Sequence, residues 1–167
     1  MIPDLKGGHM PTMLVSYFSK SGHTKKMAES VAKGAKESGC EVILKDVLKT
    51  SFADFKNSDA IVLGSPTYYG TMAAEVKKLL DESVSGHGKL KGKIGGAFAS
   101  SGMIGGGNET TIMSILEALL IHGMIILGNA DIGHYGPVAI GEPDDRASKE
   151  CEQYGRRLGE LAIRLQK

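Results

Sequence analysis

Short apolar segments alternate along the chain with longer amphipathic ones. The short segments have the length and composition of strands and lie at residues 13–18, 41–47, 60–63, 93–99 and 124–127. The longer segments repeat apolar residues at helical spacing and lie at residues 24–38, 72–82, 109–121 and 148–165. Strands that alternate with helices predict an α/β fold, a doubly wound parallel sheet with helices on both faces. We expect residues 13–167 to form this single domain, and residues 1–12, which include a Gly-Gly-His-Met string, to be a tag remnant or a disordered N-terminus.

Composition and charge narrow the class of partner. The chain has 20 Lys and Arg against 19 Asp and Glu, a net charge of +1, which disfavours nucleic acid and anionic membranes as partners. Cys40 and Cys151 lack metal-ligand spacing and fit packing positions in a reducing compartment, so we expect no metal site. The longest apolar run, residues 112–127, contains polar residues and is too short for a membrane span. With no export signal visible, we expect a cytoplasmic protein.

Glycine accounts for 23 of the 167 residues, about twice the average share, and many glycines follow the strands. The first strand is followed by Ser19, Lys20, Ser21, Gly22, His23 and Thr24, and the third by Gly64, Ser65, Pro66, Thr67, Tyr68, Tyr69 and Gly70. The fourth is followed by Ser100, Ser101, Gly102, Met103, Ile104, Gly105, Gly106, Gly107 and Asn108. Ligands of doubly wound sheets bind beyond the carboxyl ends of the strands, so these three loops predict one binding site.

Each loop favours a different part of a ligand. In the first, hydroxyls and backbone N–H groups ahead of a helix suit a phosphate, or else form an ordinary N-cap through Ser21 or Thr24. In the second, Tyr68 and Tyr69 either stack on a planar ring or are surface residues. In the third, the glycines either let a ligand approach backbone N–H donors or form a flexible connection. A phosphate tail joined to a flat, hydrogen-bonding ring describes flavin mononucleotide (FMN).

The segments YFSKSGHT, GSPTYYG and ASSGMIGGGNETT, followed by IHGMIIL, resemble the flavodoxin-like family, and within it the WrbA-type NAD(P)H:quinone oxidoreductases. The resemblance implies a five-stranded sheet in the order 2-1-3-4-5 and FMN as cofactor. It implies that residues 19–24 hold the phosphate, that Pro66, Thr67, Tyr68 and Tyr69 flank the ring and ribityl chain, and that residues 100–107 line the pyrimidine edge. Gly70 and Asn108 complete this expected set.

The resemblance also implies that His122 reaches the flavin. From the residues alone, His122 is a helix C-terminal residue followed by a C′ glycine, Gly123. The glycine-rich segment at residues 128–141 predicts a loop over the ligand or at an interface.

Two functions fit these expectations. The three loops contain Lys20, His23 and a single acid, Glu109, and this charge favours two-electron chemistry. We therefore expect an FMN-dependent oxidoreductase that takes hydride from NAD(P)H at flavin N5 and reduces a quinone-like acceptor, with no catalytic side chain. The alternative is a flavodoxin-type one-electron carrier that serves a redox partner protein. A receiver domain and a serine hydrolase are disfavoured, because the phosphorylatable Asp and the GxSxG motif are missing.

The predicted helix at residues 109–121 is apolar on nearly all sides. Because one side covers the sheet, a second apolar side is left to be buried elsewhere. This pattern predicts a homodimer or homotetramer.

Overall fold

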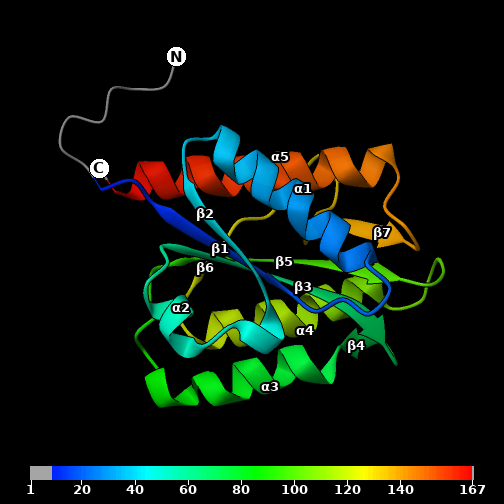
Figure 1. The fold of residues 1–167 in the computed structure, drawn as a ribbon, viewed down its shortest axis with the longest axis horizontal. Helices are drawn as coiled ribbons and strands as arrows, with labels where there is room; N and C mark the ends of the chain where they lie inside the picture. The colour runs from blue at the N-terminus through cyan, green and yellow to red at the C-terminus, as the bar shows by residue number, and fades with distance from the viewer. Residues whose placement is uncertain (1–8, 167) are drawn as a thin grey trace.

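Five parallel strands form the sheet at the centre of the computed structural model, which describes residues 9–166 (Figure 1). They are β1 (Thr12–Tyr17), β2 (Glu41–Asp46), β3 (Ala60–Tyr68), β5 (Ile94–Ser101) and β6 (Ile125–Ile126). Their spatial order, β2-β1-β3-β5-β6, confirms the predicted order, because the extra element β4 (Thr71–Met72) only forms a hairpin with β3. β1 begins one residue before the predicted strand, and the carbonyl of Pro11 just before it accepts the N–H of Glu41. The prediction for residues 1–8 lies outside the described residues.

Helices cover both faces of the sheet (Figure 1). One face carries α1 (His23–Glu37) and α5 (Asp145–Leu165), and the other carries α3 (Ala74–Glu82) and α4 (Asn108–Ile121). Three short elements were not predicted from the sequence, namely the helix α2 (Phe52–Lys56) and the 3-10 turns η1 (Val47–Lys49) and η2 (Ser83–Gly86). None of the helices within residues 9–166 is both long and apolar enough to cross a membrane.

Alternation along the central strands explains why both faces are buried. Met13 and Val15 of β1 pack under α1 and α5, whereas Leu14 between them packs on the α3 and α4 side. Cys40 and Cys151 are both buried free thiols, and burial raises the pKa of Cys151 to about 12. The two cysteines therefore pack in the core, as expected from the sequence.

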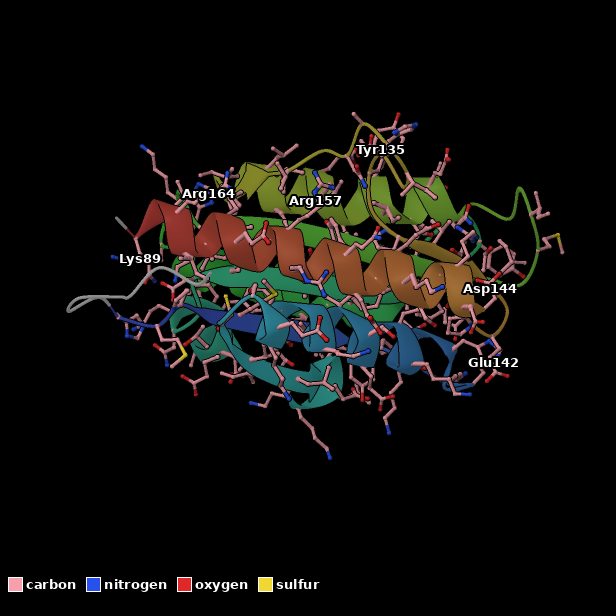
Figure 2. All side chains as sticks on the ribbon, turned by 90° about the horizontal axis from the view of Figure 1, so that it is seen from above. Lys89, Tyr135, Glu142, Asp144, Arg157 and Arg164 are labelled. Atoms are coloured by element: carbon pink, nitrogen blue, oxygen red, sulfur yellow. The ribbon has the colours of Figure 1, made fainter. Side chains whose placement is uncertain are left out.

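The fifth position of the sheet is split between two short strands. β6 pairs with the start of β5, and β7 (Val138–Ile140), which the sequence analysis missed, pairs with its end. Between them the chain leaves the sheet, and the guanidinium of Arg157 on α5 donates to the carbonyl of Gly128 at the start of this excursion (Figure 2). The segment predicted as a loop thus contains a strand that extends the sheet towards its carboxyl edge.

Candidate cofactor site

A cavity of about 440 Å³ lies at the carboxyl edge of the sheet, where the predicted loops meet. Its lining comes from the start of α1, the end of β3, the end of β5 and the residue after β7. The lining residues are Lys20, Ser21, His23, Thr24, Pro66, Thr67, Tyr68, Ser100, Ser101, Gly102 and Gly141. The structure therefore brings residues of all three predicted segments together around one space.

The first segment leaves the amino end of α1 open towards the cavity. Gly22 is the N-cap, with φ +93°, and no side chain caps the helix. The hydroxyl of Ser19 instead accepts the N–H of Gly22 at 3.1 Å, which holds the turn before the helix. The alternative in which Ser21 or Thr24 forms an ordinary N-cap is therefore wrong. Backbone amides and the positive helix end remain directed at the cavity, which is the arrangement that binds a phosphate.

Hydroxyl groups connect the segments beneath the cavity. The Thr24 hydroxyl, almost fully buried, lies 2.9 Å from the Ser100 hydroxyl and joins α1 to the end of β5. The Thr67 hydroxyl lies 3.0 Å from the Thr111 hydroxyl and joins β3 to the first turn of α4. These bonds fix the relative positions of the cavity walls, so that the site is largely formed without a ligand.

The second segment is mostly strand, contrary to the prediction of a loop over Gly64–Gly70. β3 continues to Tyr68, because its register with β5 extends as far as Pro66 opposite Ser100 and then its end pairs with β4. Only Tyr69 and Gly70 form the turn, with φ +49° and +79°. Tyr68 lines the cavity, whereas Tyr69 and Gly70 lie beside it and the Tyr69 ring is fully exposed.

The third segment lies at the rim. Ser100 and Ser101 belong to β5, and Gly102 is the last residue of this segment to line the cavity. The remaining predicted residues, Met103, Gly105, Gly106, Gly107 and Asn108, do not line it. Met103 and Ile104 extend their apolar side chains into solvent, and a Cβ on Gly102 or Gly105 would meet nothing within 4 Å. Gly102 and Gly105 thus border open space, whereas Gly106 and Gly107 are packed against neighbouring backbone.

His122 lies at the other edge of the sheet and does not line the cavity of its own chain. It caps the carboxyl end of α4. This helix begins on the cavity side, and its 14 residues carry the chain about 21 Å away from there. The next strand, β6, pairs with the beginning of β5. Gly123, with φ +75°, donates to Leu120, and Met124 donates to Leu119, which is a Schellman C-cap. The alternative drawn from the residues alone, a C-terminal His followed by a C′ glycine, is therefore confirmed.

The lining of the cavity is basic. Lys20 and His23 are in its lining, and no carboxylate is. Glu142, directly after the lining residue Gly141, forms an ion pair with Lys26 of α1, and that bond lowers the pKa of Glu142. Figure 2 shows Glu142 and Asp144 at this end of the molecule and Lys89 at the opposite end.

Sequence reasoning missed Gly141 and the ion pair beside it. Both depend on β7, which carries the chain back to the end of β5, where Ser101 accepts the N–H of Gly141. Three residues are too few for a recognisable strand pattern, so the only available signal was the short apolar run Val138–Ile140.

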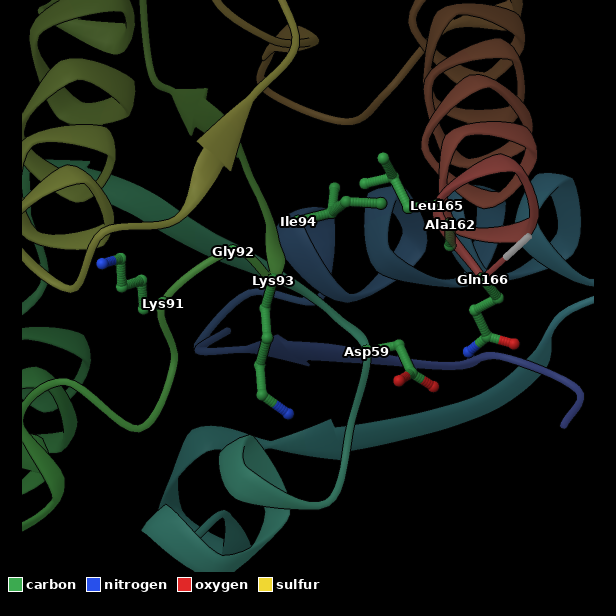
Figure 3. Close-up of a pocket in the computed structure, with 8 residues that line it drawn as sticks. All are labelled: Asp59, Lys91, Gly92, Lys93, Ile94, Ala162, Leu165 and Gln166. Carbon is green, nitrogen blue, oxygen red and sulfur yellow. The ribbon is translucent and has the colours of Figure 1, made fainter.

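A second cavity, of about 270 Å³, lies at the amino edge of the sheet (Figure 3). Two of its charged groups already serve the fold. The Lys93 ammonium donates to the carbonyl of Lys56 at 2.8 Å, and Asp59 accepts the N–H of Thr12 at 2.8 Å. Among residues 9–166 no cluster of three or more His, Cys, Asp or Glu side chains could hold a metal ion. The carboxyl edge is therefore the better candidate site.

Comparison with known proteins agrees with this fold. The family model described as a flavodoxin domain matches residues 14–113, which contain all the predicted cavity segments. The chain thus belongs to the flavodoxin family, whose members bind FMN.

Its relatives carry two kinds of name. A protein named flavodoxin from Aquifex aeolicus is 42% identical over 160 residues, which cover 90% of this chain and 86% of the relative. A protein named NAD(P)H dehydrogenase (quinone) from Rhodopseudomonas palustris is 37% identical over 155 residues, which cover 80% and 77%. The structure of a WrbA-like flavodoxin from Agrobacterium tumefaciens superposes with a TM-score of 0.80 at 28% identity, covering 94% of this chain and 99% of that one.

Proposed function

We propose that this flavodoxin-family protein is an FMN-dependent oxidoreductase that passes two electrons from NAD(P)H to a quinone-like acceptor. The observation that carries the proposal is the charge of the cavity, which is lined by Lys20 and His23 and by no carboxylate. A basic site stabilises the negative charge of a fully reduced flavin and so favours two-electron over one-electron transfer. When bound, FMN supplies hydride chemistry at its ring atom N5.

The residues of the cavity fit the two ends of FMN. The amides at the start of α1, with Ser19, Ser21 and Thr24, would hold the phosphate, and Lys20 adds positive charge there. Pro66, Thr67, Tyr68, Tyr69 and Gly70 would flank the ring and ribityl chain, and residues 100–108 would approach the pyrimidine edge. These roles need only binding and orientation, so no side chain has to transfer a proton.

The rim of the cavity suits an apolar, planar acceptor. Tyr68 is partly exposed at the cavity wall, and Tyr69, Met103 and Ile104 present large apolar side chains to solvent beside it. Exposed apolar groups next to a cavity are typical of binding surfaces. The relative named NAD(P)H dehydrogenase (quinone) supports a quinone as the acceptor.

An anaerobic titration tests the proposed activity. FMN-loaded protein is mixed with NADH or NADPH while the visible absorption of the flavin is followed, and a benzoquinone is then added. We expect the absorption to fall in one step and to return fully on addition of the quinone. Free FMN at the same concentration is the control for reduction without the protein. A preparation that takes up no FMN, or holds FMN that neither nucleotide reduces, contradicts the proposal.

The alternative function is a one-electron carrier for a redox partner protein, and the 42% identity to a flavodoxin favours it. A carrier would not react with NAD(P)H directly and would need a separate reductase. A redox titration of the bound FMN distinguishes the two, because a carrier takes up its two electrons at well-separated potentials.

We also propose that the protein forms a homodimer or homotetramer through α4 and β6. The side chains of Leu120 and Ile121 are 55% and 73% exposed, and Ile125 of the neighbouring edge strand β6 is 40% exposed. An apolar surface that continues from a helix onto a free sheet edge favours burial against another subunit.

A further inference from the structure

The turn between β3 and β4 holds Tyr69 in an unfavourable backbone conformation. Tyr69 is the only non-glycine residue among residues 9–166 with a positive φ, +49°, and Gly70 follows with φ +79°. Two positive φ values in a two-residue hairpin define a type I′ turn, whose first position normally takes Asn, Asp or Gly. A tyrosine there is strained, and its ring, which is fully exposed, makes no packing contact that would offset the strain.

A side chain from another element fixes this turn. The Thr110 hydroxyl, in the first turn of α4, lies 2.6 Å from the carbonyl oxygen of Gly70 and 2.9 Å from that of Gly107. A hydroxyl has one hydrogen, and the shorter distance assigns it to Gly70. Thr110 thus connects the tip of the hairpin to the helix that follows the third cofactor segment.

The backbones of the two segments are also in direct contact. Gly107 has φ +100°, and a Cβ built on it would lie 2.7 Å from the Cα of Gly70. A side chain at position 107 would therefore push the hairpin tip away from α4. The hydrogen bond from Thr110 joins two segments whose backbones can lie this close only because residue 107 is glycine. The hairpin tip and the end of the third segment therefore form one unit.

We propose that Thr110 is a positioning residue that holds Tyr69 at the side of the cofactor cavity, ready to cover the ring of a bound flavin. The assignment of the flavin ring to this side rests on the proposed function. Thr110 does not line the cavity, and its hydroxyl lies within hydrogen-bond distance of two backbone carbonyls, so its effect on the ligand passes through the turn. Without the bond, the strained turn can relax and carry the tyrosine ring away.

Two substitutions at one position test the proposal. Thr110→Val keeps the shape of the side chain and removes the hydroxyl, whereas Thr110→Ser keeps the hydroxyl. In the protein without FMN, we expect hydrogen exchange at the amide of Thr71, which pairs with Tyr68 across the turn, to become roughly fivefold faster in Thr110→Val, the equivalent of one hydrogen bond, and to stay unchanged in Thr110→Ser. Equal exchange in all three proteins contradicts the proposal.

A second measurement tests the effect on the ligand. A tyrosine ring in contact with a flavin quenches its fluorescence, so the emission lifetimes of bound FMN report the position of Tyr69. We expect Thr110→Val to increase the long-lived fraction of the emission roughly fivefold and Thr110→Ser to leave it unchanged. In a Tyr69→Ala background, Thr110→Val should have no further effect on the lifetimes.

The two measurements distinguish a failure of the proposed function from a failure of the positioning role of Thr110. If the wild-type protein takes up no FMN, the proposed function fails, while the hydrogen-exchange result still decides whether Thr110 holds the turn. If FMN binds and Thr110→Val changes neither its lifetimes nor the exchange rates, the positioning role fails and the proposed function stands.

Discussion

The hydroxyl of Tyr154 on α5 accepts the backbone N–H of Ala97 at 3.1 Å, at the position where the sheet lacks its fifth strand. β6 pairs with Ile94 and Gly95, and β7 pairs with Ala99 to Ser101, so Ala97 lies between the two halves. A buried N–H without a partner is destabilising, and Tyr154 supplies that partner from the helix. The side chain is buried, and burial raises its pKa to about 12.

Replacement of this hydroxyl should destabilise the fold without changing the cofactor site. We expect Tyr154→Phe to lower the free energy of unfolding by about 1–3 kcal/mol, because the N–H of Ala97 stays buried and loses its acceptor. Urea unfolding measures this change, and Tyr135→Phe, at an exposed tyrosine, is the control that should leave stability unchanged. A Tyr154→Phe protein as stable as the wild type would show that another group, such as water, replaces the hydroxyl.

The two left-handed glycines at the ends of α1 give a matched pair for the phosphate site. Gly22 precedes the helix with φ +93°, and Gly39 follows it with φ +99°. A Cβ on Gly22 would meet nothing within 4 Å, and one on Gly39 would make an ordinary contact. Alanine at either position should therefore cost about 1 kcal/mol through backbone strain alone.

Only one of the two substitutions should affect the ligand. Gly22→Ala should weaken FMN binding by about tenfold, because the amides at the start of α1 change direction when the turn relaxes. Gly39→Ala should leave the affinity unchanged. Fluorescence titration measures both affinities, and an equal effect of the two substitutions would contradict the assignment of the phosphate to this helix end.

The fold could be predicted well from the sequence because its central strands are buried on both faces. Such strands are continuous apolar runs, which is why residues 60–63 were assigned correctly. The extension of β3 through Gly64, Ser65 and Pro66 could not be predicted, since these residue types are typical of turns and are held as strand by pairing with β5. Their strand conformation depends on the neighbouring strand.

The cavity was predicted in part for a similar reason. The residues that line it directly follow or end strands, and their hydroxyls and glycines identify them in the sequence. Gly141 was missed because it depends on β7. His122 does not line the cavity of its own chain because α4 carries its two ends to opposite edges of the sheet, so nearness in sequence to a cofactor segment does not give nearness in space.

The exposed apolar side chains of α4 predict how the oligomer can be disrupted. We expect Ile121→Glu to convert the homo-oligomer to a monomer, because a carboxylate would be buried without a partner in the interface. Leu48→Glu is the control. Leu48 is 70% exposed and follows β2, the edge strand at the opposite side of the sheet from β6. Light scattering after size exclusion measures the mass of each variant. A wild-type protein that is monomeric at micromolar concentrations contradicts the proposed assembly.

His122 predicts an acid-dependent loss of stability. Its side chain is 7% exposed, and its Nε2 lies 2.7 Å from the Ser83 hydroxyl, which itself donates to the carbonyl of Leu80 at 2.6 Å. Nε2 therefore carries the hydrogen, and Nδ1 is buried without a hydrogen-bond partner among the described residues. A proton added at Nδ1 would find no acceptor there. Burial, and then the nearby His87, lower the pKa of His122 below its unfolded value of about 6.5.

The lowered pKa of His122 sets the direction in which stability changes with pH. The unfolded chain takes up a proton at His122 before the folded chain does, so the free energy of unfolding should be constant above the unfolded pKa and decrease as the pH falls below it. Urea unfolding between pH 8 and pH 5 tests this, with His122→Gln expected to reduce the decrease. His134→Gln is the control, because the exposed His134 ring already bonds to the carbonyl of Asn129 through Nδ1. If the wild type and His122→Gln lose stability equally on acidification, His122 is not the group responsible.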